Sequence, residues 1–461
     1  MEYAHAQPCT AASNYNQRHL IAVTAPFLTY LTVFKSRLGL ANIVLGQSGL
    51  AHQSDQTLLR KIRQVCEETR GLTLGDPANN DVLEYLTGKR IISGSIRKKG
   101  RYRNVTLVRD SHEWRASNHQ SKELETLPVF RTDIWMSHPD VASTIGAPTV
   151  ENARETLELC HQLKLLSKAK NTWTASGQLV SALRMGFSSL LTDSSNPFLL
   201  GLEAVALLRQ VVETDGLILR ELLRDLNNSG GSETRDEIAQ RFETIVSRAI
   251  AAAKELNLAP LTQREGRNFL FMIRDTIKKS QIKKRLAGSR LRKGTRGSDR
   301  ATSGPGVLEH RVSPRLEWLT DLGYLAKDGL PKNSFEYRVM PATGVLLRDL
   351  DKHFGDENWA DSVALAQWET NPQWSRLHPR TRTCDLSSSF RRAYRLLKRP
   401  IGPSPIRLVA FISGMICRES IGFDTALREL IYFAKVTDGV TLSGGRYRRS
   451  PENIYMTESA L

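Results

Sequence analysis

The clearest pattern of hydrophobic and polar positions lies between Val307 and Leu350. Its apolar residues recur at the spacing of one helix face, at Leu316, Leu319, Leu322 and Leu325. Ser313 and Pro314 have the residue types of an N-cap and of a first helical turn, and Gly323 is the type that ends a helix. The pattern therefore predicts a helix over residues 313–325.

After this helix, the spacing of the apolar residues changes from the helical period to the period of two that is typical of a strand. Phe335, Tyr337 and Val339 alternate with more hydrophilic residues, which predicts a strand with one buried face. Asp328 and Gly329 are turn-forming residues that precede this strand. A second helix is expected to follow and to end near residue 350, so the whole stretch is predicted to be a helix, a two-stranded hairpin and a return helix.

The same order of elements is predicted between residues 149 and 186. Residues 149–166 have helical spacing, a short strand follows around Trp173, and another helix comes after it. Six positions correspond in role between the two stretches. Leu157, Leu163, Leu166, Trp173, Gly177 and Leu183 take the places of Leu316, Leu322, Leu325, Tyr337, Gly344 and Leu350.

A helix, a tight turn, a hairpin and a return helix resemble the winged-helix DNA-binding proteins, at the level of the superfamily. In that family the helix before the hairpin enters the major groove, and the hairpin, or wing, contacts the backbone. The resemblance implies recognition helices at 149–166 and 313–325. It also implies that Arg311 and Arg315 face the groove. The alternative for Arg315 is that its aliphatic stem covers the core.

Two further hairpins with basic residues are predicted, one near each end of the chain. The first has a turn with the sequence RKKGRYR, and it carries Lys98, Lys99, Arg101 and Arg103. The second has Gly444 and Gly445 in its turn, and its tip carries Arg446, Arg448 and Arg449. Such hairpins are expected to contact phosphates, as a wing does. The alternative is that they are ordinary solvated turns.

The sharpest change in composition occurs over residues 278–304, where ten lysine and arginine residues accompany one acidic residue, Asp299. Few apolar residues are available for burial, so a mobile basic segment is expected. The candidate phosphate contacts here are Lys283, Lys284, Arg285, Arg290, Arg292 and Lys293. The alternative is a solvated linker.

The predicted fold class is mainly α with small β-hairpins, in which tandem winged-helix domains are joined by a helical core. The helical block is expected to contain two helices that meet near Asp215 and Gly216, and a further helix that begins at Ser232. The predicted domains are 1–122 with an N-terminal winged unit, 123–190 as a winged-helix-like unit, 191–280 as the helical block, 281–350 as the basic segment plus a winged-helix-like unit, and 351–461 as a helical domain with a C-terminal hairpin.

Composition favours a polyanionic partner. The chain has 461 residues and a formal charge of +17, from 65 basic and 48 acidic residues. Its isoelectric point is about 9.8. This excess favours nucleic acid over a membrane surface. No stretch is long and apolar enough to span a bilayer, and the N-terminus lacks the order of a signal peptide. Five scattered cysteines without a CxxC pair favour a reducing cytosol. A protein from a bacterium that binds DNA there is expected to associate with the nucleoid.

The sequence contains none of the common motifs for catalysis or cofactor binding. The chain lacks the phosphate-binding GxxxxGK[ST], the dinucleotide-binding GxGxxG, the zinc motif HExxH and the nucleophile motif GxSxG. No cofactor or metal is therefore expected. Asp110, Glu113 and Arg115 follow a predicted strand, where carboxylates hold Mg²⁺ in nucleases. Their spacing is short for a nuclease, and arginine replaces the usual lysine.

These observations predict a non-catalytic protein that binds duplex DNA through several winged-helix units and the basic segment. Such a protein is similar in style to regulators and to the DNA-binding subunits of DNA-modification or phage-defence systems. Two alternatives remain open. One is a protein-interaction scaffold, because winged-helix domains also bind proteins. The other is a divergent metal-dependent nuclease.

Overall fold

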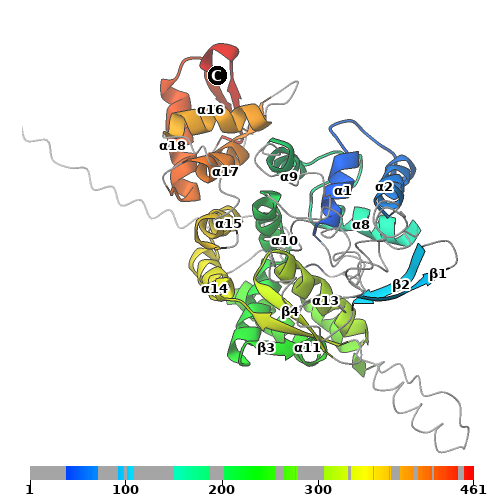
Figure 1. Cartoon of the computed structure of the whole chain (residues 1–461). Helices are drawn as coiled ribbons and strands as arrows, with labels where there is room; N and C mark the ends of the chain where they lie inside the picture. Colours follow the sequence, from blue (N-terminus) through cyan, green and yellow to red (C-terminus); the bar gives the residue numbers. More distant parts are fainter. Residues whose placement is uncertain are drawn as a thin grey trace, which may run out of the picture.

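A computed structural model (Figure 1) describes the polypeptide at residues 28, 38–70, 92–97, 101–107, 150–186, 202–255, 264, 266–275, 277–278, 306–330, 334–356, 358–372, 374, 385–397, 403–417, 420–444 and 451–461. Helices predominate in these ranges, and the strands form small antiparallel sheets. The predicted fold class is confirmed at this level, as a mainly helical protein with small hairpins.

The first group of elements, here the N-terminal unit, contains four helices. They are α1 (Leu40–Gln47), α2 (Asp55–Arg70), α8 (Val150–Gln162) and α9 (Ala175–Gly186). Isolated bridges join Gly49 to Thr172 and Leu166 to Trp173. Helix α1 packs against α2, α8 and α9. The predicted domain boundary at residue 122 therefore separates elements that contact one another.

The central unit is built around one long helix. Its elements are α10 (Glu203–Asn228), β3 (Ser232–Thr234), α11 (Arg235–Glu255), α13 (Gly306–Asp321), β4 (Leu325–Leu330), β5 (Ser334–Val339) and α14 (Pro341–His353). The sheet is antiparallel, with the strand order β3-β5-β4. The register pairs Leu325 with Val339 and Leu330 with Ser334. The predicted hairpin is confirmed, and Asp328 and Gly329 lie within β4 instead of in the turn.

The C-terminal unit repeats this strand order. It contains α16 (Leu386–Leu397), β6 (Ser404–Pro405), α17 (Ile406–Ile416), α18 (Phe423–Val436), β7 (Val440–Ser443), β8 (Asn453–Met456) and a 3₁₀ turn (Glu458–Ala460). The sheet order is β6-β8-β7, and both pairings are antiparallel. The predicted C-terminal hairpin is therefore confirmed.

Helix α15 (Trp359–Thr370) connects the central and C-terminal units. It packs against α10 and α14 on one side of the connection and against α17 and α18 on the other. Figure 1 shows the C-terminal unit above α10 and α15, with the central sheet below them. A separate antiparallel hairpin, β1 (Ile92–Arg97) with β2 (Arg101–Leu107), matches the first predicted basic hairpin.

Helices α8 and α13, which begin the two stretches aligned in the sequence, end in the same way. After α8, the Lys164 N–H donates to the His161 carbonyl oxygen at 3.0 Å, and the Leu165 N–H donates to that of Cys160 at 2.8 Å. After α13, Gly323 and Tyr324 donate to the carbonyl oxygens of Thr320 and Leu319 at the same two distances. Both ends are Schellman motifs, in which the residue after the helix has positive φ. The φ angle is 53° at Lys164 and 81° at Gly323.

Several predicted helix boundaries are wrong, among them the end of the helix predicted over residues 313–325, because α13 ends at Asp321 and Leu325 begins β4. Helix α10 continues through Asp215 and Gly216 without a break. Helix α13 begins at Gly306, so Ser313 and Pro314 lie inside it. Ser232 begins strand β3, and α11 starts three residues later. At Gly216 and Pro314 the local signal is outweighed by the burial of the apolar residues along the whole helix. At Ser232 it is outweighed by strand pairing, since β3 joins β5 in the central sheet.

Candidate nucleic-acid interface

The predicted recognition helix of the central unit is a core helix. Residues 312–319 of α13 are buried without interruption, and only the positions at either end of this run are partly accessible. Helix α11 and strand β4 pack against it. A helix that reads a DNA groove must present a solvent-exposed face to the bases. The predicted assignment of residues 313–325 to groove contact is therefore wrong.

Arg315 is the most definite correction, because its side chain is fully buried. Its guanidinium forms a two-point ion pair with Asp215, with Nε–Oδ2 at 2.6 Å and Nη2–Oδ1 at 3.0 Å. It also donates to the carbonyl oxygens of Arg311 and Leu28 at 2.7 and 2.8 Å. These four contacts all lie inside the protein, so the guanidinium of Arg315 does not contact nucleic acid.

Asp215 completes this arrangement from α10. Its Oδ1 accepts the N–H of Leu28 at 2.9 Å, so Asp215 and Arg315 together hold both polar groups of one backbone residue. Burial raises the pKa of Asp215, and the neighbouring guanidinium and the Leu28 N–H act in the opposite direction. The ion pair thus joins α10, α13 and the segment near the N-terminus.

Arg311 and helix α8 present few exposed cationic groups that could bind a phosphate backbone. Arg311 is half-buried, with its guanidinium carbon 5.8 Å from the ring centre of Phe269. It also donates to the Met272 sulfur at 3.7 Å. On α8 the exposed described side chains are Arg154 and Glu158, which have opposite charges. The exposed side chains of the predicted recognition helix of the N-terminal unit therefore carry no excess of positive charge.

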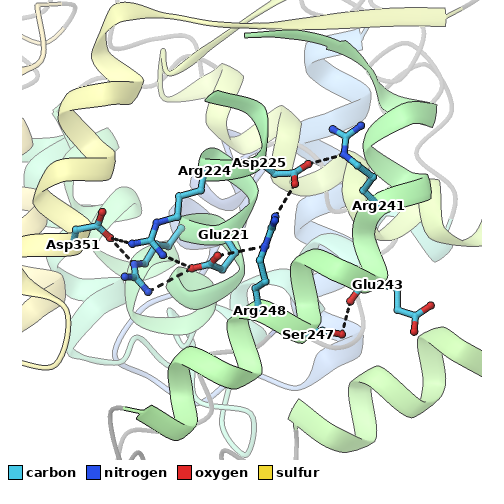
Figure 2. Close-up of polar contacts among 9 residues, drawn as sticks. Glu221, Arg224, Asp225, Arg241, Glu243, Ser247, Arg248 and Asp351 are labelled. Atoms are coloured by element: carbon cyan, nitrogen blue, oxygen red, sulfur yellow. Dashed lines mark hydrogen bonds and ion pairs between the residues drawn. The ribbon is translucent and has the colours of Figure 1, made fainter. Parts of the chain in front are cut away.

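A cluster of arginines does lie on the central unit, between α10, α11 and α14 (Figure 2). Glu221 accepts from Arg224 at 2.8 Å, and Asp351 accepts from Arg220 and Arg224 at 2.6 and 2.7 Å. On the other side, Asp225 accepts from Arg241 at 2.8 Å and Arg248 at 2.6 Å, and Glu233 also pairs with Arg241. We call these eight residues the arginine network.

The arginine network is better explained as a set of ion pairs that stabilise the central unit than as a binding site for a polyanion. Its four arginines face four carboxylates, namely Glu221, Asp225, Glu233 and Asp351, and the first three of these are buried. A cluster with no net charge does not attract a polyanion. The network therefore fastens three helices and one strand together.

Helix α18 of the C-terminal unit differs, because one whole face is exposed. Phe423, Ala426, Leu430 and Phe433 are buried on one side. The exposed residues on the other side are Asp424, Thr425, Arg428, Tyr432, Lys435 and Val436. With 100° between successive residues, Arg428 and Tyr432 lie at the centre of this face. In the described residues, α18 is exposed along one whole face, whereas residues 312–319 of α13 are buried.

The arginines of the C-terminal unit fall into two kinds. Arg391 and Arg395 donate to the carbonyl oxygens of Ala460 and Leu461. Arg407 forms an ion pair with the buried Asp361 of α15. These three hold the unit together or attach it to the central unit. The side chain of Arg428 is 73% exposed, and it forms an ion pair of 3.7 Å with the adjacent Glu429.

Exposed aromatic and aliphatic residues also gather on the C-terminal unit. Tyr432 and Val436 lie one turn apart on α18, with 62% and 61% of their surface exposed. Tyr455 on β8 is 47% exposed. Tyr432 and Val436 therefore lie at the centre and at the edge of the same exposed helix face.

The remaining predicted contacts lie mostly outside the described residues. This holds for Lys98 and Lys99, for the segment residues Lys283, Lys284, Arg285, Arg290, Arg292 and Lys293, and for Arg446, Arg448 and Arg449. Arg101 and Arg103 lie on strand β2, where they are paired in register with Arg97 and Ser95. The described residues thus do not bring the predicted contacts together into one surface.

The catalytic alternative receives no support from the described part of the chain. There, no group of three or more histidine, cysteine, aspartate or glutamate residues is arranged to hold a metal ion. Asp110, Glu113 and Arg115 of the nuclease hypothesis lie outside the described residues. Cys160 is fully buried, and burial raises the pKa of its thiol. A buried thiol of this kind is a packing residue and not a nucleophile.

No described helix combines the length and the apolarity needed to cross a membrane. Comparison of the chain with family models, with curated proteins and with solved structures gives no match.

Sequence reasoning missed α18 as the most exposed candidate. The signal was present, because Phe423, Ala426, Leu430 and Phe433 recur at helical spacing and leave Arg428 on the opposite face. The same helical spacing occurs in α13, where residues 312–319 are covered. Only the tertiary structure distinguishes these two helices.

Proposed function

We propose that this protein binds duplex DNA without catalysing a reaction, and that the C-terminal unit is a winged-helix domain which makes the principal contact. The observation that carries the proposal is the one-sided exposure of α18 directly before the β7–β8 hairpin. In a winged-helix domain this position belongs to the helix that enters the major groove.

The order of elements supports the same assignment. Helix α16, strand β6, helices α17 and α18, and strands β7 and β8 follow one another along the chain, and β8 lies between β6 and β7 in the sheet. A winged helix has this succession of helices and strands, with the last strand in the middle. The loop between β7 and β8 is then the wing, and its sequence contains Arg446, Arg448 and Arg449.

Charge supports a polyanionic ligand for this unit. Residues 385–461 contain twelve lysine and arginine residues and seven acidic residues. Each phosphate that a cationic side chain neutralises releases condensed counterions, which makes the affinity depend steeply on salt. The basic segment at 278–304 is proposed to add non-specific contacts of the same kind.

The N-terminal and central units are proposed to be further winged-helix domains that serve as scaffold. An isolated bridge follows α8, and a hairpin follows α13. The central sheet has the same relative strand order as the C-terminal one. Because residues 312–319 of α13 are buried, the central unit contributes packing in this proposal. Fold alone does not determine function, so each unit is assigned by what its surface exposes.

The test is a titration of the whole protein with a random-sequence duplex across a series of salt concentrations. The wild-type chain is compared with a variant in which Arg446, Arg448 and Arg449 are changed to serine. We expect tight binding at low salt. The slope of log Kobs against log salt is expected to be shallower in the variant by about 2 to 3, at about 0.9 per phosphate contact.

The matched control removes the same charge from another surface. Arg60, Arg348 and Lys352 are exposed and lie on α2 and α14. Their replacement by serine is expected to leave the salt slope within about 0.5 of the wild-type value, since long-range screening alone contributes little. Absence of binding by the wild-type chain at low salt would contradict the proposal, as would an equal change of slope in both variants.

A protein-interaction scaffold is the second candidate, and exposed Tyr432 and Val436 favour it. Apolar and aromatic residues at the centre of an interface supply much of the binding energy in protein complexes. Such a complex would depend weakly on salt. A chain that shows no duplex binding, but self-associates or binds a partner with salt-insensitive affinity lost in Tyr432→Ala, would establish this function instead.

A further inference from the structure

The exposed face of α18 has a definite centre. At 100° per residue, Arg428 and Tyr432 lie 40° apart around the helix axis, and Thr425 and Lys435 lie on either side of them. The positions opposite, Phe423, Ala426, Leu430 and Phe433, are all buried. If α18 enters a groove along this face, Arg428 and Tyr432 are the side chains that reach the floor.

Arg428 is the arginine of this face that the fold does not use. Its ion pair with Glu429 joins two adjacent exposed residues, with 73% and 43% of their side chains accessible. Surface pairs of this kind contribute little to stability. By contrast, Arg407 is paired with a fully buried carboxylate. Arg428 can therefore turn toward a ligand at little cost to the fold.

The orientation of α18 is fixed by the rest of the protein. Asp424 accepts a hydrogen bond from the side-chain amide of Asn358 at 3.1 Å, which ties the first turn of α18 to the start of α15. Helices α15 and α17 pack against α18 from the buried side. A recognition element held by a rigid body presents its side chains in one register.

We propose that Arg428 and Tyr432 form a sequence-reading pair, in which Arg428 recognises a guanine and Tyr432 packs against a neighbouring base. This inference rests on the proposed function. An arginine matches the O6 and N7 acceptors of guanine in the major groove through two parallel hydrogen bonds. Four residues of helix rise about 6 Å, which spans about two base-pair steps. The tyrosine ring supplies a flat apolar contact to the adjacent base edge.

The test is selection of bound duplexes from a randomised pool by the full-length protein, followed by affinity measurements on the selected site and on a random duplex. The wild-type chain is expected to enrich sites with an invariant guanine. Arg428→Ala is expected to weaken binding to the selected site by about 5- to 150-fold, as loss of one two-point base contact does. Its affinity for the random duplex is expected to change by less than about threefold.

The conservative variants separate base reading from charge. Arg428→Lys retains the charge but lacks the planar two-point donor, so it is expected to lose most of the preference for guanine. Tyr432→Phe keeps the ring and is expected to keep the site, whereas Tyr432→Ala is expected to relax preference at the position next to the guanine. Arg348→Ala, which removes an exposed arginine from α14, is the matched control and is expected to leave the selected site unchanged.

Two results would overturn the inference while leaving the proposed function intact. One is duplex binding by the wild-type chain with no enriched guanine. The other is an equal loss of affinity for selected and random duplexes in Arg428→Ala, which would make this residue a phosphate contact. Failure of the wild-type chain to bind any duplex would instead reject the proposed function, and the inference with it.

Discussion

Arg315 and Arg428 have the same side chain and opposite surroundings. Arg315 is fully buried and paired with Asp215, while Arg428 is mostly exposed beside Glu429. The sequence places both in helices near hydrophobic residues, and the partner of Arg315 lies 100 residues away along the chain. The role of each arginine thus depends on contacts that no local pattern contains.

Removing one partner of the buried pair is predicted to be costly. Arg315→Met leaves the Asp215 carboxylate buried without its cation, and we expect the free energy of unfolding to fall by about 3 to 5 kcal/mol. Denaturant titration of the purified variant measures this loss. Arg348→Met makes the same substitution at an exposed position, and it is expected to lower the free energy of unfolding by less than about 0.5 kcal/mol.

The double variant Asp215→Leu with Arg315→Met separates the ion pair from simple loss of packing. Replacement of a whole buried pair by apolar residues is often close to neutral, so the double variant is expected to recover part of the loss. Equal costs for Arg315→Met and Arg348→Met would show that Arg315 is not buried as described.

At the scale of single elements, α10 shows why a glycine need not mark a junction. The chain was expected to break near Gly216, yet α10 runs through it as one helix of 26 residues. A Cβ atom at this position would lie 2.2 Å from Cη2 of the Trp359 side chain. Gly216 is therefore needed for the close approach of α15, and not for a turn.

Gly216 and Gly344 form a matched pair for testing this explanation. Both lie in helices, but a Cβ at Gly344 would meet nothing within 4 Å. Gly344→Ala is expected to stabilise the protein by about 0.5 to 1 kcal/mol through helix propensity. Gly216→Ala is expected to destabilise it by about 1 to 3 kcal/mol, because the indole must shift. Thermal or chemical unfolding measures both, and a stabilising Gly216→Ala would disprove the close contact.

The hydrophobic periods predicted the elements more reliably than their limits. Leu316 and Leu319 lie in α13 as predicted, and the alternation from Phe335 to Val339 correctly placed strand β5, whereas Leu325 begins β4. The start of the helix was wrong, because Leu308 and Val312 are buried as well and extend α13 beyond Pro314. Cap-forming residues indicate an end only where nothing packs against the preceding turn.

The candidate interface could be predicted only in part. The basic hairpin near the C-terminus was recognised, and its two strands are present as β7 and β8. The region of α18 is expected to be helical as part of the domain at 351–461, but the sequence pattern does not distinguish the exposed face of α18 from the covered face of α13. That difference arises because α13 is packed by α11 and β4, and these contacts join residues far apart in the sequence.

At the scale of the whole molecule, one carboxylate connects the central and C-terminal units. Asp361 of α15 is fully buried, accepts from Nε of Arg209 of α10 at 2.7 Å, and also pairs with Arg407 of α17. Burial acts to raise the pKa of Asp361, but the two guanidinium groups outweigh it and hold the pKa below its ordinary value. Charge pairing therefore contributes to the contact between the two units.

The sign of the resulting acid dependence follows from this depressed pKa. A carboxylate whose folded-state pKa lies below its unfolded value of about 3.9 contributes stability above that pH, and the contribution is lost as the pH falls through the folded-state pKa. Asp361→Asn is expected to lower the free energy of unfolding by about 3 to 5 kcal/mol at neutral pH. The difference between wild type and variant is expected to narrow below about pH 4.

Unfolding titrations between about pH 3 and pH 7 test this expectation. Hydrogen exchange adds a spatial measurement, because loss of Asp361 is expected to increase exchange in both α10 and α17. Increased exchange in one helix alone, or a difference between the proteins that does not change with pH, would contradict a connecting role for this side chain.

The contact between the buried ion pair and Leu28 has a consequence for evolution. Asp215 and Arg315 bind the amide and the carbonyl of that residue, and neither of these hydrogen bonds involves its side chain. Selection on the hydrogen bonds can therefore act on the two charged positions while position 28 drifts, with proline excluded because it has no amide hydrogen. Positions 215 and 315 are expected to covary among descendants of this sequence, since either change alone leaves a buried charge.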